Sequence, residues 1–573
     1  MATKMEVEAA AAAAAVVASV GSGACSGGGS GSGSATKRKL AAVDAPAGLV
    51  VQFGHGVFMR GHIDWMLQRS RDAGLWAGKV VGVKLTSRGG IGPLGAAPAY
   101  PLAVRGARGG ARIDEASEVD IVERWLNPHD NDAKGGGGGL AALLATATAP
   151  HVAAVVSNST EAGIAYTAAP SPFDRRGVAK RCPESFPAKL TLWLATRFGA
   201  GAGGAGAGGA KLTILPLELV EDAAAKLRGI VLRHANDWRL DDHAALHAGA
   251  LAASSTFGYD TAGGATAFEA WLAEHVEFRS TLVDRIVTKP DDADDPRLVV
   301  VEPYHLLVVE EPPAAAAAAA HAATATATAT ASGGELERQL RLKAAGLNVV
   351  YARDGDLARW RTRKVRLLNG AHHALVFLGL RLGLGNVREC MAHAALGSFV
   401  RHVLAREVAP ALDGADLAAR AAAEQAEVDG YVATVLERFA NPFLDHRLAS
   451  IALNSAAKAR VRLLPAIGDY QARAHAQQEA SSSSVEGGAG RSEQGASVAR
   501  GRGAALPPGL VLALAAFFAY DGPPLAGCDA EPTRAEACAE VAGLNEALER
   551  ATAALRDDTE AAIRAVVDGA MWI

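Results

Sequence analysis

This chain has few cysteines, few aromatic residues and no strong excess of either charge. Its 573 residues include five cysteines and 5% aromatic residues, and the net charge is −4. The cysteines lack the paired spacing that zinc sites and disulfide frameworks use. A near-neutral charge gives no drive towards nucleic acid or an anionic membrane, because both need concentrated Lys and Arg. We therefore expect a reducing compartment, no metal site and no nucleic-acid partner.

Long apolar runs are also missing. No stretch of about 18 strongly apolar residues occurs, so we expect no membrane-spanning helix. The Ala-rich run at 9–20 resembles the core of a signal peptide, but Glu6 and Glu8 stand where a positive region is expected. A cytoplasmic location is the expectation, and targeting to an organelle by the leader stays open.

Low-complexity segments interrupt the chain. Residues 1–46 resemble a disordered Gly/Ser/Ala leader, because they have no apolar periodicity to bury. Similar blocks predict surface loops, since they bury too little apolar area to offset the conformational entropy that ordering would cost. These blocks lie at residues 135–139, 199–210, 313–333 and 477–505.

The remaining sequence divides into two halves. Short apolar runs alternate with helical patterns in the first half, which predicts a mostly parallel sheet. The runs cover residues 48–53, 79–85, 151–157, 211–217 and 297–303. After about residue 356 long Ala/Leu/Arg patterns follow helical spacing, as at 395–412 and 546–567. We expect an α/β fold with a Rossmann-like dinucleotide-binding domain at 47–355 and an all-α domain with substrate and catalytic residues at 356–573.

The first apolar run leads directly into a glycine turn. Gly54 and Gly56 allow a tight turn and a close approach of backbone to a pyrophosphate, which the next helix N-terminus would also attract. The third glycine of the GxGxxG pattern is replaced by Met59, so an ordinary turn is the competing interpretation. The candidate cofactor-binding residues are Val51, Gln52, Phe53, Gly54, His55, Gly56, Val57, Phe58, Met59 and Arg60.

The choice between NAD and NADP is open. The segment 83–90, after the second expected strand, lacks the acidic residue that binds a ribose hydroxyl, and Lys84 and Arg88 could tolerate a 2′-phosphate. Glu161, after the third expected strand, could contact the nicotinamide ribose or the substrate. It could equally cap the following helix.

The segment 361–376 places Lys364, Asn369 and His372 on one expected helix. At about 100° per residue, His372 lies roughly 80° and Asn369 roughly 140° around the axis from Lys364. A lysine of lowered pKa is a general base, an amide can steady an alkoxide, and an imidazole can orient a hydroxyl. This set suits interconversion of alcohol and ketone without metal. A solvated basic helix is the alternative.

Several blocks in order resemble one family. They are QFGHGVF (52–58), VSNSTEAGIAY (156–166), FPAKLTLWLATRF (186–198), LPLELVED (215–222), STLVDRIVT (280–288), VEPYHLLVVE (301–310), RTRKVRLLNGAH (361–372) and RFANPFLDHRLASIALNSAAKARVRLLP (438–465). The chain resembles the long-chain polyol dehydrogenases that include mannitol dehydrogenase, over about residues 48–573 without the low-complexity insertions. Val57 and His55 depart from the family's loop, which leaves the contacts of that loop open.

The resemblance implies an N-terminal NAD domain, a helical C-terminal domain and zinc-independent hydride transfer. It assigns the catalytic triplet to Lys364, Asn369 and His372. The phrases STEAG and IALNSAAK are closer to the branch of the family that acts on sugar acids, so a hexuronate is the expected substrate. A neutral polyol, in a mannitol/fructose type of reaction, is the second candidate. A catalytically silent dinucleotide-binding protein is the third.

A sugar acid needs a cation opposite its carboxylate. The candidates are Arg438, Lys458 and Arg460, with Arg361 as an alternative. A solvated basic face would explain the same residues. The partners expected of the chain are this small molecule and, at most, further copies of itself in a small homo-oligomer.

Overall fold

The computed structural model describes most of the chain after the leader. The described residues are 46–130, 139–175, 177–201, 211–240, 266–290, 294–312, 333–353, 355–412, 422–485, 505–523, 525, 526, 528 and 531–571. The leader at 1–45 and most of the low-complexity blocks lie outside them. Residues 477–485 are an exception: they were expected to form a loop but continue helix α18 (Leu464–Val485), where the segment HAQQEA is rich in helix-forming residues.

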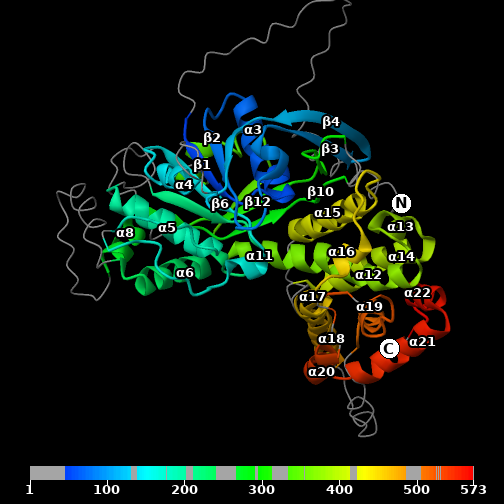
Figure 1. The fold of residues 1–573 in the computed structure, drawn as a ribbon. Helices are drawn as coiled ribbons and strands as arrows, with labels where there is room; N and C mark the ends of the chain where they lie inside the picture. The colour runs from blue at the N-terminus through cyan, green and yellow to red at the C-terminus, as the bar shows by residue number, and fades with distance from the viewer. Residues whose placement is uncertain are drawn as a thin grey trace, which may run out of the picture. The chain divides into compact units, whose positions relative to one another are not determined.

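A six-stranded parallel sheet forms the base of the first half (Figure 1). Its strand order is β5-β2-β1-β6-β7-β8, the order of a doubly wound dinucleotide-binding fold. Val-rich strands suit this sheet because helices cover both of its faces. The strands are β1 (Leu49–Phe53), β2 (Lys79–Val83), β5 (Val122–Leu126), β6 (Val152–Ser157), β7 (Leu212–Pro216) and β8 (Val276–Phe278).

Helices of the first half connect and flank these strands. They are α2 (Val57–Met59), η1 (Arg60–Asp64), α3 (Trp65–Asp72), η2 (Gly92–Gly95), α4 (Gly139–Ala147), η3 (Glu161–Ile164), α5 (Phe186–Gly199), α6 (Ala223–Asp237), α8 (Ala267–His275) and α10 (Gly334–Leu340). Two apolar clusters lie between helices and sheet, one around Trp193 and Phe198 and the other around Trp76 and Tyr100. The predicted α/β class is confirmed.

Two smaller sheets accompany the parallel one, and the sequence reasoning did not foresee them. One has the order β10-β11-β3-β4 and the other β13-β12-β9. The apolar run at 297–303 was expected in the parallel sheet, but its strand β11 pairs with β3 and β10 instead. The strands are β3 (Tyr100–Arg108), β4 (Ala111–Val119), β9 (Thr281–Asp284), β10 (Val287–Thr288), β11 (Val299–Val301), β12 (Leu306–Glu310) and β13 (Val349–Ala352).

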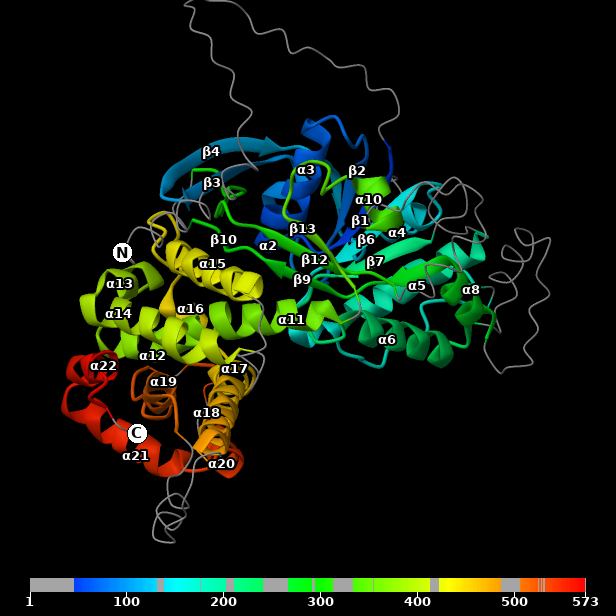
Figure 2. The same cartoon turned by 180° about the vertical axis from the view of Figure 1, so that it is seen from behind.

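Helices make up the second half, which begins after β13. They are α11 (Asp356–Arg363), η6 (Lys364–Asn369), α12 (Gly370–Arg381), α13 (Val387–Ala392), α14 (Ala394–His402), η7 (Val403–Val408), η8 (Ala409–Ala411), α15 (Ala422–Phe439), α16 (Leu448–Ala452), α17 (Ser455–Arg462), α18, α19 (Pro508–Phe518), α20 (Glu531–Glu540), α21 (Leu544–Asp557) and α22 (Thr559–Val567). Figure 2 shows α19 among α12, α18 and α21. Its run from Gly509 to Phe517 is buried in one apolar cluster with α12 and α21. No helix in the described ranges is long and apolar enough to cross a membrane.

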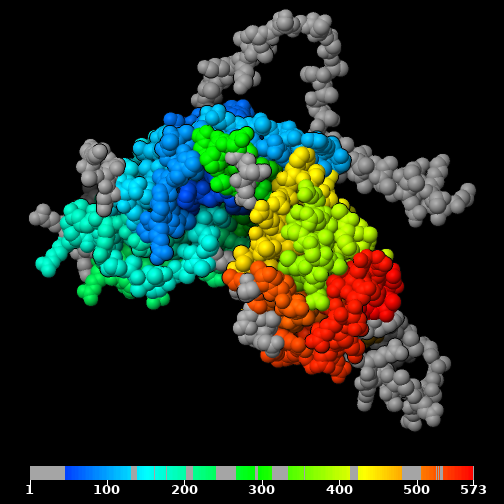
Figure 3. Space-filling model, turned by 45° about the vertical axis from the view of Figure 1, so that its right-hand side comes forward, coloured from blue at the N-terminus to red at the C-terminus, as the bar shows by residue number. Residues whose placement is uncertain are grey.

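The two halves touch where the β3–β4 hairpin meets α15 and the segment after it. The backbone N–H of Gly110 at the hairpin turn donates to Glu437 over 2.9 Å, and the Asn441 amide donates to the Arg105 carbonyl over 3.0 Å. The Arg112 guanidinium lies over the ring of Phe443. Figure 3 shows the yellow surface of α15 against the blue surface of the hairpin. These contacts hold the helical half against the sheets on one side of the candidate site.

Candidate functional site

The switch in strand order lies between β1 and β6, and the glycine turn leaves β1 there. Ligands of such sheets bind outside the carboxyl ends of the strands at this point. Gly54 has a φ of +127°, and a Cβ on it would lie 2.9 Å from the carbonyl oxygen of Asn158, which follows β6. Only glycine fits this position without strain. At Gly56 a Cβ would meet nothing within 4 Å, so the space beside the first turn of the helix is open.

The predicted cofactor loop divides into residues that face outwards and residues that support it. His55, Gly56, Val57 and Phe58 are partly or fully exposed. Val51, Phe53 and Met59 are buried in the apolar clusters. Gln52 and Arg60 are buried as well, and they donate to the carbonyls of Gly54 and Arg297 over 3.1 and 2.8 Å.

Buried polar groups behind the loop were missed from the sequence. Asp64 accepts hydrogen bonds from the Tyr100 hydroxyl at 3.0 Å and from the Gln52 amide at 3.4 Å. Burial raises the pKa of Asp64 to about 7, although both hydrogen bonds act in the opposite direction. Asp64 and Tyr100 therefore support the turn from beneath, since the Tyr100 hydroxyl also donates to the Arg60 carbonyl.

A second support lies at the end of β6. The buried Glu218 carboxylate accepts from the Ser157 hydroxyl and from both the N–H and the hydroxyl of Ser159, over 2.8 to 3.1 Å. The Asn158 amide donates to the Leu217 carbonyl. Glu161 begins the short helix η3, and its side chain lies outside the described part of the structure. Its predicted contact with the cofactor stays a prediction.

Lys84 follows β2, where a ribose-binding acid is usual. Its ammonium group donates to the Thr86 hydroxyl at 3.0 Å, to the Arg88 carbonyl at 2.7 Å and to the Thr86 carbonyl. Three oxygens of its own loop thus hold the Lys84 charge.

The predicted catalytic triplet lies on one continuous helical stretch, α11–η6–α12. Its middle part, Lys364–Asn369, is a π-helix, in which the Gly370 N–H bonds the Val365 carbonyl five residues back. Residues five apart are therefore about one turn apart, and Asn369 lies closer to the side of Lys364 than α-helical spacing predicts. Such π-turns are frequent at functional sites.

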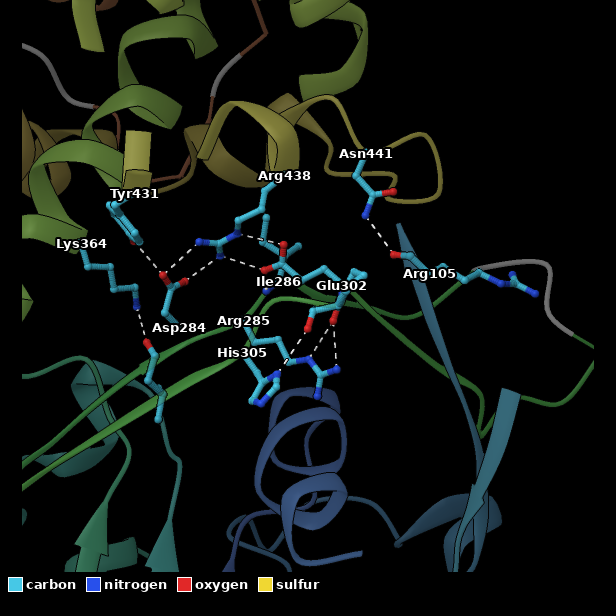
Figure 4. Close-up of polar contacts among 12 residues, drawn as sticks. Arg105, Asp284, Arg285, Ile286, Glu302, His305, Lys364, Tyr431, Arg438 and Asn441 are labelled. Atoms are coloured by element: carbon cyan, nitrogen blue, oxygen red, sulfur yellow. Dashed lines mark hydrogen bonds and ion pairs between the residues drawn. The ribbon is translucent and has the colours of Figure 1, made fainter. Parts of the chain in front are cut away.

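Lys364 extends from this turn to the edge of β9. Its ammonium group donates to the carbonyl of Val283 over 2.6 Å (Figure 4). Burial is the main cause that lowers the Lys364 pKa, and Arg438, Arg462 and Arg361 lower it further, whereas Asp284 raises it. A lysine in this position can accept a proton from a substrate hydroxyl at a lower pH than a free lysine can.

Asn369 and His372 have unsatisfied buried atoms. The side-chain oxygen of Asn369 and the Nε2 atom of His372 find no hydrogen-bond partner among the described residues. The His372 ring lies 4.1 Å from the ring of Phe439 and 4.7 Å edge-on from that of His446, centroid to centroid. Burial lowers the pKa of His372 well below its usual range, with smaller contributions from neighbouring charges. The imidazole is therefore neutral at pH 7.

A buried ion cluster joins the two halves next to Lys364. The Arg438 guanidinium of α15 donates to both carboxylate oxygens of Asp284 over 2.7 and 3.0 Å and to both of Glu302 over 2.8 and 2.9 Å (Figure 4). The Tyr431 hydroxyl also donates to Asp284 over 2.8 Å. Burial alone would raise the Asp284 pKa, but the charge and hydrogen bonds of Arg438 outweigh it and the pKa is lowered.

The four predicted substrate cations lie in different surroundings. Arg438 is held by the two carboxylates of the cluster, and Arg460 pairs with Glu536 of α20 on the surface. Lys458 donates to the Ile451 carbonyl over 2.7 Å, and its charge acts on His373 and His446. The charge of Arg361 acts on Lys364. Arg361 and Arg438 thus act on residues of the triplet, Lys458 lies beside His373 and His446, and Arg438 and Arg460 have acidic partners.

Two family models match the chain. The Rossmann domain of mannitol dehydrogenase matches residues 49–321, and the C-terminal domain of mannitol dehydrogenase matches residues 356–480. An altronate oxidoreductase of Halalkalibacterium halodurans is 34% identical over 439 residues, which cover 74% of this chain and 71% of that protein. The chain belongs to the mannitol dehydrogenase family. The resemblance inferred from the sequence is confirmed, and the protein is an oxidoreductase of the dehydrogenase type that acts on CH–OH groups.

Further relatives agree with this assignment. An altronate oxidoreductase of Yersinia enterocolitica is 31% identical, covering 74% of this chain and 75% of that protein. Among solved structures, mannitol 2-dehydrogenase of Pseudomonas fluorescens, in a ternary complex with NAD and D-mannitol, has a TM-score of 0.56 at 17% identity. The match covers 93% of this chain and 99% of that one. This structural likeness supports the two-part fold.

The two loop glycines should respond differently to alanine. Gly54→Ala places a side chain at a φ of +127° and against the Asn158 carbonyl, so we expect it to destabilise the protein by about 1–3 kcal/mol. In Gly56→Ala the added methyl group meets no protein atom within 4 Å, so the melting temperature should stay near that of the wild type. A bound pyrophosphate at Gly56 would nevertheless meet the new methyl group, and cofactor affinity, measured by NADH fluorescence, should fall. Unchanged NADH affinity of Gly56→Ala would contradict this placement.

Replacing Arg438 should destabilise the protein strongly. Arg438→Met leaves Asp284 and Glu302 buried next to each other without a cation, which typically costs about 3–5 kcal/mol. Arg460→Met is the matched control, because its pair with Glu536 is exposed and should matter little. Denaturant unfolding of the two variants measures the difference. Equal stabilities would show that the cluster does not hold the halves together.

Proposed function

We propose that this protein interconverts D-tagaturonate and D-altronate with NAD as cofactor. The supporting observation is the combination of Lys364, Asn369 and His372 on one helical stretch with relatives that are named altronate oxidoreductases at 29 to 34% identity. The names of the relatives support a sugar acid as the substrate. The catalytic triplet supports the interconversion of an alcohol and a ketone.

The loop after β1 fits a dinucleotide. Gly56 leaves open space beside the first turn of the helix, and the N–H groups of that turn are available to a pyrophosphate. The outward residues His55, Val57 and Phe58 would border it. NAD is the cofactor because the family's Rossmann domain is present and the solved mannitol 2-dehydrogenase that the chain resembles is in complex with NAD.

Lys364 would move the proton of the reaction. When bound, the oxidised nicotinamide would accept the hydride that leaves the substrate carbon. During oxidation the substrate O–H bond breaks and its proton passes to the Lys364 amine, while the hydrogen on the same carbon leaves with its electron pair and the C=O bond forms. Asn369 can donate its amide N–H to the oxygen as negative charge develops there. In reduction Lys364 returns the proton to that oxygen.

A neutral polyol is the second candidate substrate. The structural likeness to a mannitol 2-dehydrogenase and the neutral His372 both suit a ligand rich in hydroxyl groups. The relatives at 29 to 34% identity are instead named for a sugar acid, altronate. This favours the sugar acid.

A panel of substrates tests the proposed function directly. Purified protein should form NADH with D-altronate, and kcat/KM should exceed that for D-mannitol and D-sorbitol by about tenfold or more, because a charge-assisted hydrogen bond to a carboxylate contributes about 1.5–3 kcal/mol. Preference for mannitol would favour the polyol alternative. If none of the substrates is turned over, the third candidate, a catalytically silent dinucleotide-binding protein, is favoured.

Removing Lys364 should abolish turnover without loss of cofactor. Lys364→Ala should lower kcat by orders of magnitude and leave NADH affinity near normal, because the cofactor loop lies in the other half of the chain. Burial lowers the lysine pKa, so the rate of oxidation should rise with pH through a value below 10.5 and then level off. Lys364→Ala should lack this rise of the rate with pH. A variant that turns over normally but binds NADH poorly would contradict the role.

The carboxylate clamp can be tested with the four predicted cations. Lys458→Met and Arg361→Met should reduce the preference for altronate over mannitol if either residue faces the carboxylate. A reduction of roughly 10- to 150-fold corresponds to one charge-assisted hydrogen bond. Arg460→Met serves as control, since Glu536 already binds its guanidinium. If the preference for altronate over mannitol is unchanged in all these variants and in Arg438→Met, none of these cations binds the substrate carboxylate.

A further inference from the structure

A small cavity lies beside His372, at the boundary of the two halves. It has a volume of about 10 Å³, which is the room of a single water-sized group. Its lining combines Ile286, from the segment between β9 and β10, with residues of the helical half. The polar residues of the lining are His372, His446, Arg388, Arg438 and Asn441.

Three of these polar residues already have protein partners. Arg438 bonds Asp284 and Glu302, the Asn441 amide donates to the Arg105 carbonyl and its oxygen accepts from the Phe443 N–H. Arg388 donates to the Pro442 carbonyl over 2.6 Å. The atoms that remain unsatisfied are ring nitrogens: Nε2 of His372 and Nδ1 of His446 have no hydrogen-bond partner within the described ranges.

The Nε2 atom of His372 requires a hydrogen-bond donor. Both imidazoles are neutral at pH 7, because burial lowers the pKa of His446 to about 4 and that of His372 well below its usual range. His372 also has a hydrogen bond to the backbone of Leu368 that raises its pKa, which means that the ring donates its N–H there. Its Nε2 atom is then a bare acceptor. Unpaired buried acceptors of this kind are costly and call for a donor group.

A hydroxyl group satisfies this cavity and a carboxylate does not. A hydroxyl can donate its one hydrogen to Nε2 of His372 and accept from an N–H at Nδ1 of His446, whereas an ionised carboxylate only accepts. His372 lies eight residues after Lys364 on the same helical stretch, or roughly 12 Å along its axis. The long lysine side chain shortens this gap, so one extended six-carbon sugar acid can reach both.

We propose that His446, together with His372, forms a seat for one hydroxyl group of the substrate. The inference rests on the proposed function, since it names how the sugar acid is oriented there. His446 is a positioning residue for the substrate.

The test compares wild type with His446→Phe on D-altronate and its monodeoxy analogues. Phenylalanine keeps the ring but lacks the nitrogens. For D-altronate we expect kcat/KM to fall about tenfold or more, because a buried hydrogen bond is lost. For one analogue, which lacks the seated hydroxyl, wild type and variant should perform equally. His475→Phe, at an exposed position on α18, is the control and should behave as wild type. His446→Leu, which also lacks the ring nitrogens, provides a second variant with the same expected fall if His446→Phe does not fold.

Ligand binding separates this proposal from the proposed function. The rise in melting temperature that D-altronate causes in the presence of NAD should be smaller in His446→Phe than in wild type. Equal rises, or an equal fall in kcat/KM for every analogue, would overturn the seat, and the cavity would then hold a structural water only. Absence of turnover in wild type with all sugar acids and polyols would instead overturn the proposed function.

Discussion

The buried guanidinium of Arg438 is the interaction on which the rest of the site depends. It comes from α15 in the helical half and binds Asp284 and Glu302 at strand ends of the first half. Lys364 bonds the Val283 carbonyl beside the same Asp284. A charge this deeply buried is tolerated only when its partners surround it, so the cluster fixes how α15 meets β9. The position of Lys364 relative to the cofactor loop follows from that contact.

The chemistry of the site depends on burial at a second level. Burial lowers the pKa of both Lys364 and His372, because the charged form of each group is less stable away from water. Asp284 works against this at Lys364, while Arg438 offsets part of its effect. The cluster therefore connects structure with reactivity: the same ion pair that joins the halves also adjusts the lysine that would act as base.

The sequence allowed the two-part fold, the turn at Gly54 and the helix of Lys364 to be predicted, because each has a local signal. The ion cluster has none: Arg438 and Asp284 are 154 residues apart, so Arg438 was interpreted as a substrate cation. The π-turn at Lys364–Asn369 was missed since no residue pattern announces it. The β3–β4 hairpin was missed too, although Gly109 and Gly110 at its turn, both with positive φ, are a recognised hairpin signal. His446 became visible only through the cavity it lines.

The transfer of deuterium tests the central claim most directly. D-Altronate that carries deuterium on the carbon to be oxidised would be incubated with the protein and NAD, and the reduced cofactor would be analysed by mass spectrometry. The account predicts that the deuterium appears in NADH, because the hydride passes directly from that carbon while Lys364 takes only the hydroxyl proton. Deuterium found in the solvent, or oxidation without reduced cofactor, would contradict it.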